Sequence, residues 1–158
     1  SFDIVHPLDN TKHLRHSFVE GPRYDLIYRG EVNLVNGSAF INIDSDSVST
    51  GGQVMTPGTF EALTRNPSIF LQNQSGWGSV KGTITGANLH ITCEDSNSSD
   101  TVSWMVVAER KDEHVIDESN QSDSQGRMIL EYDPNVQSVM GDEYVYPSDK
   151  ITGPEIFN

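Results

Sequence analysis

The dipeptide Asn36-Gly37, within residues 24–43, marks a chain reversal more clearly than any other feature of this sequence. A two-residue type I′ turn needs a positive φ at both central residues, and Asn-Gly adopts this geometry readily. Apolar and polar residues alternate on both sides of the turn, which is the pattern of a strand with one buried face. We therefore expect a β-hairpin in which Leu34 lies opposite Ala39. Because two strands alone are marginally stable in water, this hairpin needs a larger sheet to join.

Two later stretches predict further strands. Residues 80–93 have the pattern of a second hairpin around a type II′ turn at Gly86-Ala87, where glycine takes the first central position. Residues 101–110 give the strongest strand pattern, with apolar side chains on both faces. A strand of this kind belongs in the middle of a sheet or between two layers.

One short helix is expected between the two hairpins. Thr56 is a candidate N-cap, Pro57 suits the first helical position, and Asn66-Pro67 ends the helix after about two or three turns. With about seven strands, turn signals between them and this one helix, the sequence predicts an all-β fold, either a β-sandwich or a small barrel.

The charge of the chain narrows the choice of partners. It carries 23 acidic and 10 basic residues, a formal net charge of −13. Such a chain is repelled by the phosphates of nucleic acids and by anionic membrane surfaces, so neither is an expected partner. No apolar run approaches the roughly 18 residues of a membrane-spanning segment, so no membrane insertion is expected. Cys93 is the single cysteine, which excludes an internal disulfide.

The acidic residues are unevenly distributed, and the change near Asp112 suggests two parts. Residues 1–112 contain 13 acidic and 8 basic residues, whereas residues 113–158 contain 10 acidic and 2 basic ones. Apart from a possible strand at residues 127–132, the second part has scattered apolar residues among Gly, Pro and Asp. We expect a β-sandwich domain over 1–112 and an extended acidic C-terminal arm over 113–158, which lies on its own domain or wraps a neighbouring subunit.

Five motifs within residues 2–112 occur together in a known type of domain. They are Phe2-x-Ile4-x-His6-Pro7-Leu8, Leu14-x-His16-Ser17-x-Val19-Glu20-Gly21-Pro22, Tyr28-Arg29-Gly30, Gly58-Thr59-Phe60-x-x-Leu63-x-Arg65-Asn66 and Ser103-Trp104-x-Val106-x-x-Glu109-Arg110-Lys111-Asp112. In these motifs the chain resembles a domain found near the C-termini of phage tail-fibre proteins, especially those of marine phages, and of large fibrous bacterial surface proteins. The resemblance implies a β-rich homotrimer at the distal, host-contacting end of a fibre. It implies no catalytic residues.

On this resemblance we expect a viral tail-fibre domain, extracellular and part of the virion, that attaches to a host cell through a surface glycan or an outer-membrane receptor. Its other partners would be further copies of the chain and other fibre or tail proteins. Two alternatives stay open: a trimerisation and folding module without receptor contact, and a bacterial surface adhesin domain. No enzyme and no cofactor are expected, because the sequence contains neither a Gly-x-Ser-x-Gly elbow nor an HExxH motif.

Trp77, between Gly76 and Gly78, is the main candidate for ligand binding. We expect it to be exposed in a bend and to offer a flat ring on which a sugar stacks, with Tyr144 and Tyr146 assisting. A structural role at a subunit contact is an equally good interpretation of Trp77, since tryptophan is also enriched there.

Metal sites have weaker support in the sequence. His6, His13 and His16 lie close together in the chain, but their spacing matches no zinc motif, and packed or hydrogen-bonded histidines are the preferred interpretation. Asp44 and Asp46 offer oxygens to a cation such as calcium, yet their loop lacks the glutamate of an EF-hand, so solvated acidic residues are the default. We therefore expect no metal, with these five residues as the weak candidates.

Overall fold

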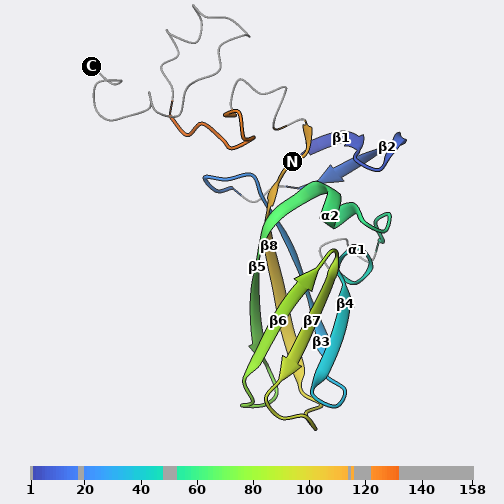
Figure 1. Ribbon diagram of the computed structural model, residues 1–158, viewed down its shortest axis with the longest axis vertical. Helices are drawn as coiled ribbons and strands as arrows, with labels where there is room; N and C mark the ends of the chain where they lie inside the picture. Colours follow the sequence, from blue (N-terminus) through green and yellow to red (C-terminus); the bar gives the residue numbers. More distant parts are fainter. Residues whose placement is uncertain (1, 18–19, 48–52, 114, 116–121, 132–158) are drawn as a thin grey trace, which may run out of the picture.

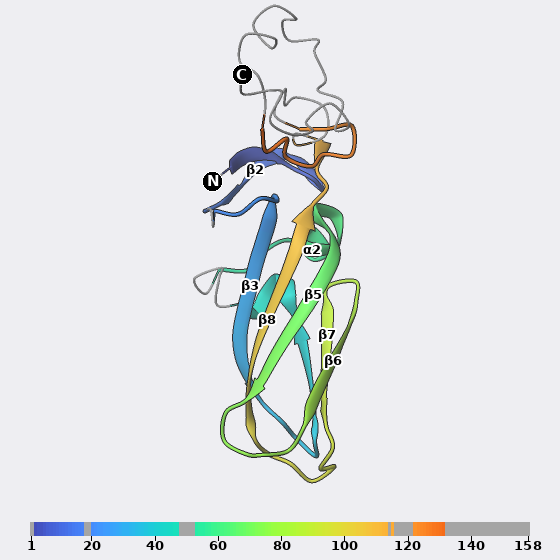
Figure 2. The same cartoon turned by 90° about the vertical axis from the view of Figure 1, so that its left-hand side faces the viewer.

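The computed structural model describes residues 2–17, 20–47, 53–113, 115 and 122–131. Two three-stranded antiparallel sheets, ordered β3-β8-β5 and β4-β7-β6, face each other, and the hairpin β1-β2 lies at the end drawn uppermost in Figure 1. The elements are β1 Phe2–His6, β2 Asp9–His16, β3 Asp25–Asn33, β4 Ser38–Asn42, α1 Ile43–Asp46, α2 Thr59–Leu63, β5 Thr64–Asn73, β6 Val80–Thr85, β7 Asn88–Cys93 and β8 Thr101–Arg110. Figure 2 shows β3, β8 and β5 running side by side along the molecule, with β6 and β7 next to β5. The described part of the chain is thus an all-β sandwich, as the sequence predicts, with two short helices instead of one.

The turn at residues 36–37 forms as predicted, but the hairpin around it does not. Its two residues have φ of 51° and 68°, as a type I′ turn requires. Beyond the bridge between Val35 and Ser38 the two arms separate, since β3 pairs with β8 and β4 pairs with β7. The predicted pair Leu34–Ala39 is therefore wrong. The arms belong to opposite sheets because their apolar side chains then face each other across the core instead of sharing one face of a ribbon.

The second hairpin and the central strand are confirmed. β6 and β7 pair in the predicted register, with Ile84 opposite Leu89, and Gly86 at their turn has a φ of 59°. β8 pairs with β3 on one side and with β5 on the other, so it is the middle strand of its sheet. The indole of Trp104 on β8 lies against Gly30 of β3, where a Cβ would come within 2.8 Å of the ring. A glycine on one strand thus makes room for the tryptophan on the next.

The core lies between the two sheets and continues beneath the β1-β2 hairpin. Leu89 and Ile91 of β7 and Val102 and Val106 of β8 are each 0% exposed. Burying one such side chain contributes about 1.5–3 kcal/mol relative to leaving it exposed. Leu14 of β2 belongs to the same cluster, so apolar packing attaches the hairpin to the sandwich.

The helix predicted between Thr56 and Asn66 forms, but it is shorter than predicted. α2 spans Thr59–Leu63, and its N-cap is Gly58, with a φ of 91°, and not Thr56. β5 follows α2 directly, so residues 66–67 interrupt the register of a strand instead of ending a helix. Pairing with β8 satisfies the backbone of this stretch and buries one of its faces, which outweighs the local helix signal.

A carboxylate from a preceding element caps α2. α1 lies where the sequence predicts a loop, and Asp44 within it is buried. Its Oδ2 accepts a hydrogen bond from the Gly58 N–H at 2.8 Å, and its Oδ1 accepts one from the Phe60 N–H at 2.8 Å. Because the first N–H groups of a helix have no partner within it, Asp44 replaces the side-chain cap that Gly58 lacks.

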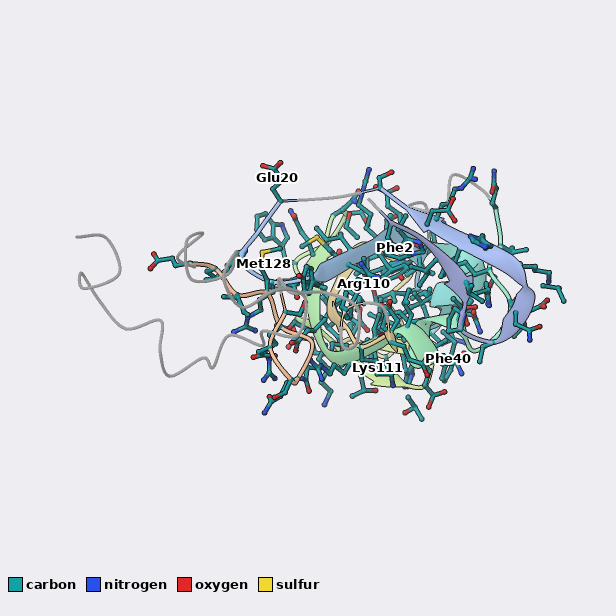
Figure 3. All side chains as sticks on the ribbon, turned by 90° about the horizontal axis from the view of Figure 1, so that it is seen from above. Phe2, Glu20, Phe40, Arg110, Lys111 and Met128 are labelled. Carbon is teal, nitrogen blue, oxygen red and sulfur yellow. The ribbon has the colours of Figure 1, made fainter. Side chains whose placement is uncertain are left out.

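A stack of side chains fixes the β1-β2 hairpin to the sandwich. The His16 ring on β2 lies parallel to that of Phe2 on β1, with 4.9 Å between centroids, and the Arg110 guanidinium covers Phe2 at 3.8 Å. Figure 3 shows Phe2 and Arg110 close together in the view from above. Arg110 also makes a two-point ion pair with Asp112, with both contacts at 2.8 Å. The stack therefore connects the hairpin to the end of β8 by cation–π and aromatic contacts.

Beyond β8, the described residues stay close to the sandwich. Val115 is buried, and the Tyr24 hydroxyl lies 2.9 Å from that of Ser122. Arg127 Nε lies 3.0 Å from the Glu109 carboxylate. This first part of the predicted arm is therefore attached to the sandwich.

The strand predicted at residues 127–132 does not form in the part that is described. Met128 makes a single bridge to Ser122, and residues 127–131 belong to no named strand. The rest of the predicted arm, residues 132–158, lies outside the described residues. No helix in the described part of the chain is long and apolar enough to cross a membrane.

Candidate functional site

Three loops lie at the end of the sandwich opposite the β1-β2 hairpin (Figure 1). They are residues 34–37, 74–79 and 94–100, which connect β3 to β4, β5 to β6 and β7 to β8. Backbone hydrogen bonds join them: the Gly37 N–H donates to the Ser98 carbonyl at 2.9 Å, and the Glu94 N–H donates to the Ser79 carbonyl at 2.9 Å. The three loops form one connected surface, which we call the distal end.

Trp77 projects from the distal end into solvent. Its relative exposure is 104%, the highest among the large hydrophobic side chains of the described residues, so the predicted exposure is confirmed, while the bend itself lies at residues 74–75. Neither neighbouring glycine has room for a Cβ. A Cβ at Gly76 would clash with the Asp100 carboxylate, and a Cβ at Gly78 would lie 2.8 Å from the Cys93 sulfur. The loop lies tightly against the strand ends because both neighbours of Trp77 lack a side chain.

Asn73, the last residue of β5, holds this loop in shape. Its Nδ2 donates to the Gly78 carbonyl at 3.1 Å and to the Asp100 carboxylate at 2.9 Å. Its Oδ1 accepts a hydrogen bond from the Gly76 N–H at 2.9 Å. One amide thus closes the loop on both sides of Trp77. A ligand that binds the indole does not first have to order the backbone, which lowers the entropic cost of binding.

The chemistry that the distal end offers is stacking and hydrogen bonding. The indole of Trp77 has a flat apolar face and one N–H donor. Val35, at the neighbouring turn, is 70% exposed and adds a second apolar side chain. The carboxylates of Asp100 and Glu94 already accept hydrogen bonds within the loops. This arrangement suits a ligand with an apolar face and a polar rim.

The three histidines proposed from the sequence lie at the other end, in a cleft of about 770 Å³. The cleft is bounded by β2, by the first half of β3 and by residues 53–56. His6, His13 and His16 all line it, together with the basic side chains of Lys12 and Arg15 on β2. The fold therefore brings the histidines to one cleft, and their individual partners decide what they do there.

Each of these histidines has a different partner. His6 is buried, and its Nδ1 accepts a backbone hydrogen bond at 3.1 Å. The Nδ1 of His13 lies 2.6 Å from the Asp3 carboxylate, and the Nε2 of His16 lies 3.0 Å from the Tyr28 hydroxyl. Burial lowers the pKa of His16 below its usual value. Among the described residues, no group of three or more His, Cys, Asp or Glu side chains is arranged to hold a metal. The buried, hydrogen-bonded interpretation thus fits His6, whereas His16 is half-buried and His13 is an exposed residue beside a carboxylate.

The two aspartates named as weak cation ligands serve the fold in a way that the sequence does not reveal. Both oxygens of Asp44 cap α2, and the side chain is 1% exposed, so the predicted solvated loop is wrong at this position. Asp46 Oδ2 accepts the Asn42 N–H at 2.9 Å, and its Oδ1 accepts the Ser45 hydroxyl at 3.0 Å. All four carboxylate oxygens thus have donors within the protein.

Two exposed aromatic side chains escape the sequence-based prediction. Phe40 on β4 is 74% exposed, and Phe70 on β5 is 52% exposed. Both stand at outward positions of strands whose alternate residues turn inward, which is a period-of-two signal that the sequence carries. The signal alone is ambiguous, because the register of pairing decides which face of a strand is buried.

Tyr144 and Tyr146, the other members of the predicted ligand platform, lie outside the described residues, so the distal site is built on Trp77. The resemblance to fibre domains stays a prediction. A scan against models of known protein families finds no match, and a search of curated proteins also finds none.

Proposed function

We propose that this chain is the distal domain of a viral tail fibre and attaches the particle to a host cell by binding a surface glycan at Trp77. The observation that carries the proposal is a fully exposed indole on a loop held by the Asn73 amide, at the end of the sandwich opposite β1. A fibre joined at the β1 end would present this loop outward. Preordered aromatic side chains of this kind are frequent centres of binding energy.

A sugar fits the chemistry of the distal end. The C–H groups on one face of a pyranose ring pack against the electron-rich face of an indole, and its hydroxyl groups need polar partners around that ring. Ser96, Asn97 and Ser99 are exposed in the adjacent loop and offer such groups. The net charge of −13 disfavours anionic sugars, so we expect a neutral glycan.

The proposal includes a homotrimer, because three weak sites on one tip bind a surface far more tightly than one. Support comes from an apolar strip on the outer face of β3-β8-β5. Its members occupy outward positions and are neighbours in the registers of the sheet: Ile27, Phe70, Met105 and Val107. Apolar and aromatic side chains of this kind are typical of contacts between subunits. Other fibre or tail proteins would hold the trimer on the extracellular virion.

The same apolar strip favours a second candidate function, a trimerisation and folding module without receptor contact. In that module the strip would carry the function and Trp77 would have no ligand. A bacterial surface adhesin is the third candidate, and it differs from the first in location and not in the site. An outer-membrane receptor in place of a glycan would use the same exposed indole.

A glycan array tests the first proposal against the second. We expect the full-length chain to bind neutral glycans, and Trp77→Ala to weaken this binding at least about fivefold, because the stacking platform is lost. Trp77→Phe keeps a flat ring and should retain part of the affinity. Val54→Ala is the control, since it removes a similarly exposed apolar side chain at the other end of the sandwich and should change the affinity less than about twofold.

Equal binding by wild type and Trp77→Ala would remove the distal site from the proposal. A chain that binds no glycan on the array would favour the folding module.

A further inference from the structure

The outer face of the sheet β4-β7-β6 carries an exposed aromatic ring at the middle of β4. Phe40 is 74% exposed and lies parallel to His90 of β7, with 4.1 Å between ring centroids and 4° between ring planes. The two residues are direct cross-strand partners. The imidazole therefore covers one face of the phenyl ring, and the other face is open to solvent.

The contacts around this pair set the orientation of the ring. The Nε2 of His90 lies 2.9 Å from the hydroxyl of Ser38, which precedes Phe40 by two residues on the same face. Ala39 and Ile41, on the other face of β4, are buried in the core, so the strand cannot turn. Because the ring is already in place, a ligand that stacks on it loses little affinity to ordering.

Hydroxyl and amide side chains occupy most of the outward strand positions around Phe40. The strand registers place nine side chains on this outer face: Ser38, Phe40, Asn42, Lys81, Thr83, Thr85, Asn88, His90 and Thr92. None of the nine is acidic, in a chain with 23 acidic residues, and Lys81 is the one with a permanent charge. Asn42 and Asn88 are joined by a hydrogen bond of 3.4 Å between their amides. The strand positions of this face thus present neutral hydrogen-bonding groups and no carboxylate.

We propose that this face is a second saccharide-binding site, which takes a neutral hexopyranose polymer with one sugar ring stacked on Phe40. The apolar face of a pyranose matches the open face of the phenyl ring, whose quadrupole attracts C–H groups. Thr83 and Asn88, on the two strands beyond β4, are exposed and supply donors and acceptors for the hydroxyl groups of neighbouring sugars. The site consists of strand residues and does not depend on Trp77.

The outer face of the other sheet, β3-β8-β5, has the apolar composition that is typical of a contact between copies of a chain. There, Phe70 pairs with Met105, and Val107, the next outward residue of β8, pairs with Ile27. Phe40, in contrast, has no aliphatic side chain beside it among the nine outward positions. Protein interfaces are poor in serine and lysine and rich in apolar side chains at their centre, so the hydroxyl-rich face suits a saccharide better than a second copy.

Affinity electrophoresis in native gels containing dextran, mannan or galactan tests this proposal with the full-length chain. We expect at least one of these neutral polysaccharides to retard the wild type, and Phe40→Ala to weaken this binding at least about fivefold. Phe40→Trp keeps a flat ring and should preserve the retardation. Val54→Ala is the control, because it removes an exposed apolar side chain that belongs to neither proposed site nor to the apolar strip, and it should behave as wild type. Since Phe40 is exposed, its variants should melt at the wild-type temperature.

Variants at the two sites distinguish this proposal from the one at the distal end. On any polysaccharide that retards the wild type but not Phe40→Ala, Trp77→Ala should still be retarded, whichever result it gives on the glycan array. Migration unaffected by all three polysaccharides would overturn the saccharide site on this face, and so would equal losses for Phe40→Ala and Val54→Ala. A lower molar mass of Phe40→Ala in light scattering would also overturn it, by making the face a contact between copies.

Discussion

His16 contacts two aromatic rings at the top of the sandwich and is half-buried. Phe2 stacks on its ring, and the Tyr28 hydroxyl lies 3.0 Å from its Nε2. Burial lowers the pKa of His16, because the charged imidazolium loses more hydration than the neutral ring. The folded state therefore favours the neutral form, and protonation favours the unfolded state, in which histidine has its usual pKa of 6.5.

This shift predicts a loss of stability in acid. The contribution of His16 to the free energy of unfolding is fully present above pH 6.5. It is lost as the pH falls from 6.5 towards the lower pKa of His16 in the folded state, because the unfolded chain binds the proton first. His16→Gln keeps a hydrogen-bonding side chain but does not titrate, so it should reduce this pH dependence in urea unfolding. Tyr28→Phe is the control: it should lower stability by about 1 kcal/mol at each pH without reducing the slope. An unchanged slope in His16→Gln would contradict the assignment.

Glu109, unlike His16, is a buried group that keeps its charge in the folded state. Its side chain is 6% exposed and lies 3.2 Å from Arg65 and 3.0 Å from Arg127. Burial acts to raise the pKa of Glu109, but hydrogen bonds from Asn66 and Arg65 and the charges of both arginines bring it below the usual value. The charged carboxylate thus joins β5, β8 and the segment that follows β8.

Among the elements, β8 is the central strand of the sheet β3-β8-β5 and holds that sheet together. It pairs with β3 and with β5, and its inward residues Val102, Trp104 and Val106 are at most 2% exposed. The position of the Trp104 indole requires Gly30 on β3, because the ring occupies the space of a side chain there. The packing of two strands therefore depends on the absence of one methyl group.

Gly30→Ala tests this contact. We expect it to lower the free energy of unfolding by about 1–3 kcal/mol, because the new Cβ would lie within 2.8 Å of the Trp104 ring and displace it. Gly21→Ala is the matched control, since nothing lies within 4 Å of a Cβ built at that glycine, and its effect should stay within about 0.5 kcal/mol. Urea unfolding followed by tryptophan fluorescence measures both. Equal midpoints for the two variants would show that the sheet accommodates the methyl group without cost.

At the scale of the whole molecule, the proposed fibre tip depends on assembly. We expect a molar mass of three times 17.5 kDa by light scattering. Deleting residues 113–158 should dissociate the trimer if the acidic arm wraps a neighbouring subunit, the alternative to its lying on its own domain. A deletion of residues 132–158 alone keeps the contacts of Ser122 and Arg127 with the sandwich, so it separates loss of the arm from damage to the fold. A monomer at micromolar concentration would break the fibre proposal, and a truncated chain that stays trimeric would exclude the arm as the contact.

The sequence by itself determines the features that depend on neighbouring residues. The turn at residues 36–37 follows from the φ preferences of Asn and Gly, and the hairpin at residues 80–93 follows from its turn and its alternation. The exposure of Trp77 follows from its two glycines and polar surroundings. The central place of β8 follows from its apolar side chains on both faces, which only an interior strand can bury.

Only the tertiary structure decides which distant segments meet. β3 and β4 separate into different sheets although their turn favours a hairpin, because the core gains more when their apolar faces oppose each other. Asp44 caps a helix whose start lies 14 residues away, at Gly58, and no local pattern marks that contact. The Asn73 amide that holds the Trp77 loop and the stack of Phe40 on His90 likewise join separate strands. Local preferences are set by a few dihedral angles, whereas these contacts exist only once the sheets have packed.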